Sequence, residues 1–327
     1  MLIIKRSRRP LWAHVAVLLV LVLLSLPNVS VAFAQDATKL VFFGDSLSDP
    51  GNYFVAFGTI AQQPFVPIPD APYAIGGHHF SNGATWAEQL AGKLHLPTSG
   101  SPALRTPGVF TNYAVGRARA RAGAPVFPQY DLSTQVSFFL SDFGGQAPSD
   151  SLYVVWIGAN DLDDALNALA SDPSGGTSGV IIQAAINAVA ANIYALWSYG
   201  GRTFLIPNVP NLALTPAVRA LGPGAQGAAT QLTVAYNGAL DQVLSDLHAG
   251  LGIKVVRLDV NALFGAVLAA PETFGLADVE DPCLTFFVTG SAICETPNQY
   301  LFWDGIHPTT TGHDLIARAA LQALTAP

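Results

Sequence analysis

Three side chains that could cooperate in nucleophilic catalysis stand at opposite ends of the sequence. Ser46 follows a short apolar run, while Asp304 and His307 are three residues apart, with Gly305 between them. A serine hydroxyl is a weak nucleophile unless a base takes its proton and a third group orients that base. Histidine suits the role of base because its pKa lies near neutrality. These three residue types together predict a catalytic triad. Their order along the chain, Ser, Asp, His, is compatible with this prediction, because triads are recognised by the roles of their residues rather than by order.

The apolar run before Ser46 predicts a buried parallel strand, because Leu40 to Phe43 are all apolar and two are aromatic. Ligands bind at the carboxyl ends of strands in open α/β sheets, which is where Ser46 would stand. Further strands are expected over 109–115, 152–157, 203–210 (running into a proline-rich loop) and 253–258. Helical spacing of apolar residues predicts helices over 84–94, 131–143, 162–170, 180–199, 226–248, 260–268 and 309–324.

Alternation of strand and helix over five units predicts an α/β fold with a mostly parallel, five-stranded sheet covered on both faces. The carboxyl ends of parallel strands share one edge. Ser46, the region of Gly116, and Asn160 would therefore meet at a common site. No linker or repeat interrupts the pattern, so residues 35–327 are expected to form a single domain.

Four short blocks carry a resemblance to a known family. Gly-Asp-Ser-Leu (44–47), Asn-Tyr-Ala-Val-Gly (112–116), Gly-Ala-Asn-Asp (158–161) and Asp-Gly-Ile-His-Pro (304–308) occur in this order along the chain. They resemble the four blocks of the GDSL family, the SGNH hydrolases, and cover almost the whole mature chain. The ending Phe-Trp-Asp-Gly-x-His-Pro-Thr is similar to that of the secreted bacterial lipase, phospholipase and lecithinase-like branch. The resemblance implies a flavodoxin-like three-layer α/β/α sandwich.

The resemblance also implies donors for an oxyanion, which often make the largest electrostatic contribution to acyl transfer. In the family, a glycine N–H of the second block is one donor. Here Gly116-Arg117-Ala118 stands where Gly-Gly-Ala is common, so the donor is the N–H of Gly116 or, alternatively, of Arg117. The N–H of Ser46 and the side-chain amide of Asn160 complete the expected set. Without the resemblance, Asn160 would be taken for a turn residue.

Residues 1–34 are expected to be a signal peptide. A basic start over 5–9 precedes an apolar stretch over 11–26, and Ala32-Phe33-Ala34 is a small-x-small cleavage site. A cut after Ala34 would make the protein secreted, periplasmic or extracellular. The alternative is an uncleaved anchor, since about 16 apolar residues nearly span a bilayer. No later stretch is expected to cross a membrane.

The charge balance argues against nucleic acid as a partner. Loss of residues 1–34 removes four basic residues and no acidic one, which lowers the formal charge from -7 to -11. The only basic run, Arg117 to Arg121, is too small to reverse this. The sequence has neither a glycine-rich phosphate loop nor a His-Glu-x-x-His motif, and no cofactor or metal is expected.

The two cysteines, Cys283 and Cys294, both precede Asp304. An exported protein with only two cysteines usually pairs them. The alternative is two free buried thiols, whereas zinc is disfavoured because no histidine lies at ligand spacing beside them. The expected disulfide would staple the segment that carries Asp304 and His307.

These features predict an exported serine ester hydrolase, and the resemblance points to lipid or phospholipid esters, with transient contact to a membrane surface. The long loop over 50–81 is rich in aromatic residues, and Tyr53, Phe54, Phe57 and Phe65 are candidates for an apolar wall. His78 and His79 are interpreted as surface loop residues, and His313 is given no role. Two alternatives stay open: a carbohydrate O-acetyl esterase, and a catalytically inactive surface or binding protein.

Overall fold

The centre of the molecule is a parallel sheet of four strands in the order β1-β2-β3-β4. The strands are β1 (Lys39–Gly44), β2 (Ser151–Trp156), β3 (Thr203–Pro207) and β4 (Lys254–Leu258). The computed structural model describes residues 37–123 and 128–326, so the predicted signal peptide lies outside the described residues. Every residue of β2 is buried, as expected for a central strand covered on both faces.

The strand predicted over 109–115 is not a regular strand. The prediction of a five-stranded sheet is therefore wrong, because the sheet has four regular strands. Residues 111–115 run beside β1, but the only bridge that they form with it joins Phe42 to Asn112, and Val109 and Phe110 belong to a turn that closes on Thr106. The side chain of Asn112 accepts a hydrogen bond from the N–H of Ala114. The side-chain amide of Asn52 donates to the carbonyls of Asn112 and Ala114. Side chains thus satisfy backbone groups that a regular ladder would use. With this segment counted second, the order is the flavodoxin-like 2-1-3-4-5.

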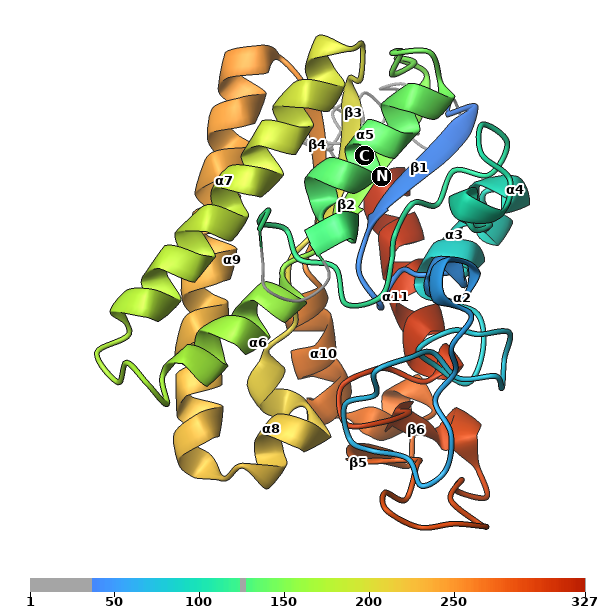
Figure 1. Ribbon diagram of the computed structural model, residues 1–327, viewed down its shortest axis with the longest axis vertical. Coiled ribbons are helices and arrows are strands. Elements are labelled where there is room, and N and C mark those ends of the chain that lie inside the picture. Colours follow the sequence, from blue (N-terminus) through green and yellow to red (C-terminus); the bar gives the residue numbers. More distant parts are fainter. Residues whose placement is uncertain (1–36, 124–127, 327) are drawn as a thin grey trace, which may run out of the picture.

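Helices cover both faces of the sheet, which makes the fold the predicted α/β three-layer sandwich (Figure 1). Alternate residues of each strand enter separate cores, so Val41 and Phe43 face one layer and Leu40 and Phe42 the other. The first layer contains α5 (Leu132–Asp142), α6 (Ala159–Ala168), α7 (Gly176–Ser198) and α9 (Pro223–Leu251). The second contains α3 (Trp86–Lys93), α10 (Val260–Ala269) and α11 (Thr310–Thr325).

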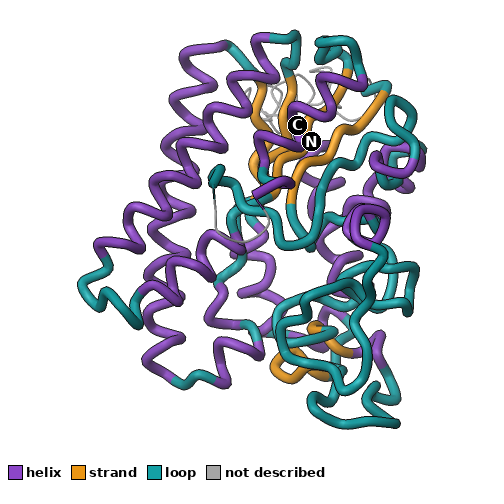
Figure 2. The backbone as a smooth tube through the Cα atoms, viewed as in Figure 1, coloured by secondary structure: helices purple, strands orange, loops and turns teal. Residues whose placement is uncertain are grey.

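Shorter elements gather beyond the carboxyl edge of the sheet, where loops predominate (Figure 2). They include α8 (Pro216–Ala220) and a second, two-stranded parallel sheet of β5 (Asp278–Pro282) and β6 (Tyr300–Phe302). Nearer β1 lie α2 (Asn52–Phe57) and α4 (Pro97–Gly100). Short 3-10 turns occupy Ala103–Arg105, Pro128–Tyr130, Leu212–Leu214, Pro271–Phe274 and Pro297–Gln299. Cys283 and Cys294 are joined by a disulfide between β5 and β6.

The expectation that no later stretch is long and apolar enough to cross a membrane is wrong for α7, which by length and composition alone could do so. In the fold it packs against α5, α6 and α9 and contributes Ile182, Ile186, Val189 and Ile193 to the core. Its apolar composition is accounted for by this packing, since a helix covered by neighbours can be apolar over much of its surface.

Candidate active site

Ser46 stands immediately beyond β1, as predicted, and is buried. The turn that holds it is closed by the N–H of Ser48, which donates to the carbonyl of Asp45 at 3.1 Å. Gly44 ends the strand where it lies tightly against β2, since a Cβ there would come within 2.5 Å of the Trp156 carbonyl oxygen. The serine is therefore carried by a rigid, close-packed strand end.

Asp304 and His307 lie on a tight turn that follows β6. One carboxylate oxygen of Asp304 accepts the N–H groups of Ile306 and His307, each at 2.8 Å, which folds the turn back on its own side chain. The N–H of Trp303 closes it by donating to the His307 carbonyl at 2.8 Å. Helix α11 begins directly after Thr309, whose side chain accepts the N–H of Gly312 and caps the helix.

The structure brings Ser46, His307 and Asp304 into one chain of hydrogen bonds. The His307 Nε2 lies 2.9 Å from Ser46 Oγ, and its Nδ1 lies 2.7 Å from Asp304 Oδ2. The carboxylate can only accept, so Nδ1 carries the proton and Nε2 is left to accept the serine O–H. This arrangement can deliver an activated hydroxyl to an electrophilic carbon.

The carboxylate of Asp304 is fully buried and well supplied with donors. The hydroxyl of Tyr73 donates to Oδ2 at 3.0 Å, beside the imidazole of His307. Burial, together with the neighbouring Asp304, raises the pKa of Tyr73 above its ordinary value of 10.0, so the phenol keeps its proton. Tyr73 was not singled out in the sequence, because 231 positions separate it from Asp304.

Gly116, one of the predicted oxyanion donors, is already hydrogen-bonded within the protein. Its N–H donates to Asp49 Oδ2 at 2.7 Å, so this donor is committed to a protein carboxylate. A Cβ at Gly116 would lie 2.2 Å from the ring of Phe80, and that ring packs against His307 with centroids 5.3 Å apart. The glycine is thus required for space, because it lets an aromatic ring support the imidazole.

Two further predicted donors, Arg117 and Asn160, are connected through Ala118, the residue that follows Arg117. Arg117 has a φ of 67°, a left-handed conformation that is uncommon for residues other than glycine and that clusters at functional sites. The Asn160 amide donates one hydrogen bond to the carbonyl of Ala118 at 2.9 Å, which fixes its orientation at the start of α6. Asp161, buried beside it, accepts the N–H of Ala120 and so anchors the Arg117 segment.

Two buried carboxyl groups flank Ser46 in the sequence. Asp49 accepts the N–H groups of Gly51, Asn52, Tyr53 and Gly116, yet burial raises its pKa to about 6. Burial likewise raises the pKa of Asp45 to about 7, and its Oδ2 has no hydrogen-bond partner among the described residues. Asp49 is a residue that sequence reasoning missed; its position ahead of a Pro-Gly turn and a short helix was the available signal.

Ser46, Asn160 and His307 open onto a cavity of about 470 Å³. Its volume and mainly apolar lining are typical of a small-molecule or lipid site. Trp156, Phe264 and Phe302 lie along it, with further apolar residues from α8 and from residues 67–68. The predicted wall is therefore wrong in detail: Tyr53 packs against Phe57 and Phe80, and the loop contributes Pro67 and Ile68 instead.

Gly305 joins the walls of this cavity to the Asp304–His307 turn. Its N–H donates to the Pro67 carbonyl, and its own carbonyl accepts the N–H of Ala217 in α8, both at 2.8 Å. A Cβ at Gly305 would come within 2.4 Å of the Pro67 oxygen, so glycine is required for this contact.

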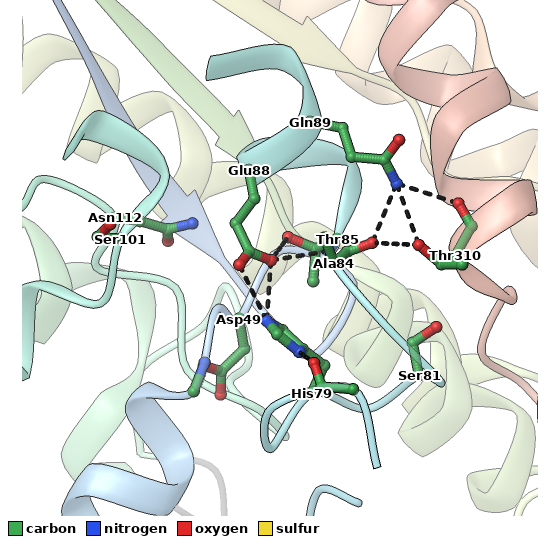
Figure 3. A network of polar contacts seen from close by, with 12 residues as sticks. Asp49, His79, Ser81, Ala84, Thr85, Glu88, Gln89, Ser101, Asn112 and Thr310 are labelled. Carbon is green, nitrogen blue, oxygen red and sulfur yellow. Dashed lines mark hydrogen bonds and ion pairs between the residues drawn. The ribbon is translucent and has the colours of Figure 1, made fainter. Parts of the chain in front are cut away.

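His79 is buried, which corrects its interpretation as a surface residue. Its Nε2 lies 2.9 Å from Glu88, and its Nδ1 lies 2.6 Å from the carbonyl of Gly76 (Figure 3). In the same network, Gln89 donates to Thr310 and so supports the start of α11. His313 is buried as well, and burial lowers its pKa to about 3. Within residues 37–123 and 128–326, no cluster of three or more His, Cys, Asp or Glu could hold a metal ion.

The chain matches the family model "GDSL-like Lipase/Acylhydrolase" over residues 40–320. It is 28% identical over 319 residues to GDSL esterase/lipase 5 of Arabidopsis thaliana, covering 86% of this chain and 82% of that protein. It is 29% identical over 331 residues to the phosphatidylcholine-sterol acyltransferase of Aeromonas hydrophila, covering 86% and 89%. An acetylxylan esterase structure from Geobacillus stearothermophilus aligns with a TM-score of 0.46 at 15% identity, covering 89% and 96%.

The protein is therefore an ester-bond hydrolase. Its four sequence blocks and the match to the family model show that the chain belongs to the GDSL lipase/acylhydrolase family.

Proposed function

We propose that this protein is an exported serine ester hydrolase that cleaves lipid acyl esters through an acyl-enzyme. The observation that carries the proposal is the bonded chain Ser46–His307–Asp304, which opens directly onto an apolar cavity. Export is inferred from the leader over 1–34, and the Cys283–Cys294 disulfide fits an oxidising compartment. Residues 35–327 form the catalytic domain.

The geometry supports a two-step reaction. Ser46 Oγ attacks the ester carbonyl while His307 Nε2 takes its proton, and Asp304 stabilises the resulting imidazolium. The tetrahedral intermediate collapses, and His307 passes the proton to the leaving alcohol. Water then attacks the acyl-serine, with His307 again acting as base, and releases the acid. No added oxidant, metal or cofactor enters this balance.

The oxyanion would be held by the N–H of Ser46, the N–H of Arg117 and the Asn160 amide. Arg117 is preferred over Gly116 because the Gly116 N–H already donates to Asp49. The Asn160 amide has two N–H bonds, and the one that donates to Ala118 orients the other.

The shape and lining of the cavity favour a long acyl chain. Apolar side chains line most of it, and burial of each CH₂ group contributes about 0.8 kcal/mol. A chain of several carbons would therefore gain affinity that acetate cannot. The name of the Aeromonas relative, which contains phosphatidylcholine, also supports a lipid substrate.

Release of p-nitrophenol from esters of increasing chain length tests this proposal. We expect turnover to rise from acetate toward medium and long chains, and Ser46→Ala to abolish it while the circular dichroism spectrum stays unchanged. A preference for acetate would favour a carbohydrate O-acetyl esterase instead. Absence of turnover in the unsubstituted protein would favour an inactive binding protein.

A further inference from the structure

Three segments, two of which line the cavity, expose large apolar side chains to solvent. The loop over 63–68 exposes Val66 and Ile68, the end of α8 exposes Leu221, and the disulfide loop over 283–294 exposes Phe287, Val288 and Ile293. Here these three segments are called the apolar rim. Large exposed apolar patches mark interaction sites more often than chance surface. We propose that the apolar rim docks the enzyme on a lipid–water interface of uncharged or zwitterionic head groups.

Hydrogen bonds hold the three segments together. The N–H of Phe287 donates to the Phe65 carbonyl at 2.9 Å, and the Gln63 side chain exchanges two hydrogen bonds with the backbone of Gly290. On the other side, Pro67 is tied through Gly305 to Ala217 of α8. In Figure 1 the loop over 60–70 accordingly lies alongside the disulfide loop. The exposed side chains thus belong to one connected surface.

Neither burial nor backbone preference accounts for a phenylalanine at position 287. Its side chain is 71% exposed, so it gains little from burial. Its φ of 62° is a left-handed conformation that costs a bulky residue energy and that glycine or asparagine would adopt more easily. A phenylalanine that neither packs well nor suits its backbone is accounted for if it inserts into another apolar phase.

The lack of charged residues in the apolar rim indicates which lipid head groups it would contact. Residues 59–69, 220–225 and 283–294 contain no Asp, Glu, Lys or Arg. Attraction to anionic lipids needs clustered Lys or Arg, which these stretches lack. The basic residue of α8 nearest to them, Arg219, is paired with Glu280. The apolar rim therefore suits a neutral or zwitterionic interface, where binding follows the apolar area that is inserted.

The apolar rim is continuous with the cavity. Ile68 and Leu221 are exposed and also line the cavity that contains Ser46. An acyl chain leaving a lipid layer could pass over these residues to the serine without entering water. This continuity favours a lipid interface over a protein partner or a second copy of the chain. The inference rests on the proposed lipid esterase function, which it extends to aggregated substrate.

The test compares Phe287→Asn with Val234→Ser. Asparagine tolerates a positive φ, so Phe287→Asn should fold at least as well as the unsubstituted protein. Val234 is 65% exposed on α9, outside the apolar rim, and serves as a matched control. Full-length proteins, with their N-termini verified by mass spectrometry, are mixed with phosphatidylcholine vesicles and the bound fraction is measured by flotation. Hydrolysis of p-nitrophenyl butyrate below its solubility limit is measured in parallel.

We expect Phe287→Asn to lower vesicle partitioning roughly tenfold, since one fully buried phenylalanine accounts for about that factor. Val234→Ser should leave partitioning unchanged, and both variants should keep the rate on soluble butyrate. The proposal is overturned if the unsubstituted protein does not bind vesicles or if both variants lose binding equally. It is also overturned if Phe287→Asn mainly dissociates a dimer in sedimentation velocity. If soluble butyrate is not hydrolysed by any protein, the esterase proposal fails, while the flotation result still decides whether the rim binds lipid.

Discussion

Among the described residues, His307 and His79 are both buried and each is paired with a carboxylate, but only His307 is proposed to act as a base. His307 bonds Asp304 at 2.7 Å, and His79 bonds Glu88 at 2.9 Å. The pairs differ in what the second ring nitrogen faces. For His307 it is the hydroxyl of Ser46, whereas for His79 it is the carbonyl of Gly76, 2.6 Å away.

This difference decides the protonation of each ring. A carbonyl and a carboxylate can only accept, so this site favours the form of His79 with protons on both nitrogens. Burial opposes its charge, but the hydrogen bond and charge of Glu88 outweigh burial and raise the pKa of His79. A serine hydroxyl can donate, which leaves His307 Nε2 free to take a proton. A buried histidine beside a carboxylate is therefore catalytic only if its other nitrogen meets a reactive donor.

Substituting each histidine by glutamine should give the largest difference in activity between the two pairs. His307→Gln removes the base, and we expect kcat/KM for p-nitrophenyl esters to fall by about 10³-fold or more. His79→Gln removes a structural cation and should lower stability while leaving kcat/KM within about tenfold. Parallel kinetics and thermal unfolding of the two variants measure both effects. Equal losses of activity would remove the distinction between the pairs.

The carboxylate partners should show the same contrast at smaller magnitude. Asp304→Asn weakens the orientation and charge that support His307, so kcat/KM should fall by roughly 10²- to 10³-fold. Glu88→Gln should chiefly lower the melting temperature, because it leaves a buried imidazolium poorly compensated. The kinetic comparison at constant pH checks this contrast, with Asp246→Asn as a carboxyl control because Asp246 is exposed on α9 and does not line the cavity.

Tyr73→Phe tests whether the hydrogen bond from Tyr73 to Asp304 contributes to activity. It removes one hydrogen bond to Asp304 Oδ2 but keeps the ring that packs against Trp303 with centroids 5.7 Å apart. A hydrogen bond to a charged group contributes about 1.5–3 kcal/mol, so we expect a fall in kcat of about tenfold. Unchanged kcat with unchanged stability would show that the imidazole is oriented without this tyrosine.

The smallest effect is on the pH dependence of stability. The folded-state pKa of His79 is raised above its ordinary value of 6.5, so its stabilisation is complete below about pH 6.5. This stabilisation is lost as the pH rises through the raised pKa. The difference in unfolding free energy between the unsubstituted protein and Glu88→Gln should therefore shrink as the pH rises above that range. Urea unfolding at pH 6 and pH 9 measures it, and a growing difference would contradict a protonated His79.

The sequence was most informative where local pattern decides structure. The apolar run before Ser46 became β1, and the three-residue spacing of Asp304 and His307 became the tight turn. Helix bounds agree closely, as for α10 at Val260–Ala269 against the predicted 260–268. These features depend on residues near one another in the chain.

The meeting of Ser46 and His307 was predicted from their residue types and the family resemblance, but other features that depend on distant contacts were not predicted. The hydrogen bond from the N–H of Gly116, a predicted oxyanion donor, to Asp49 spans 67 positions. The side chain of Asn52 satisfies the segment that was expected to be a strand, although 60 residues separate it from Asn112. The burial of His79 depends on Glu88 and on the fold of the whole loop, which no local pattern reveals.

The most direct test of the account is covalent labelling by a fluorophosphonate, with the modified residue located by mass spectrometry. We predict one label per molecule, on Ser46, with labelling slowed strongly in His307→Gln and only slightly in His79→Gln. A label on another serine, or equal labelling rates in the two histidine variants, would contradict the assignment of His307 as the base that activates Ser46.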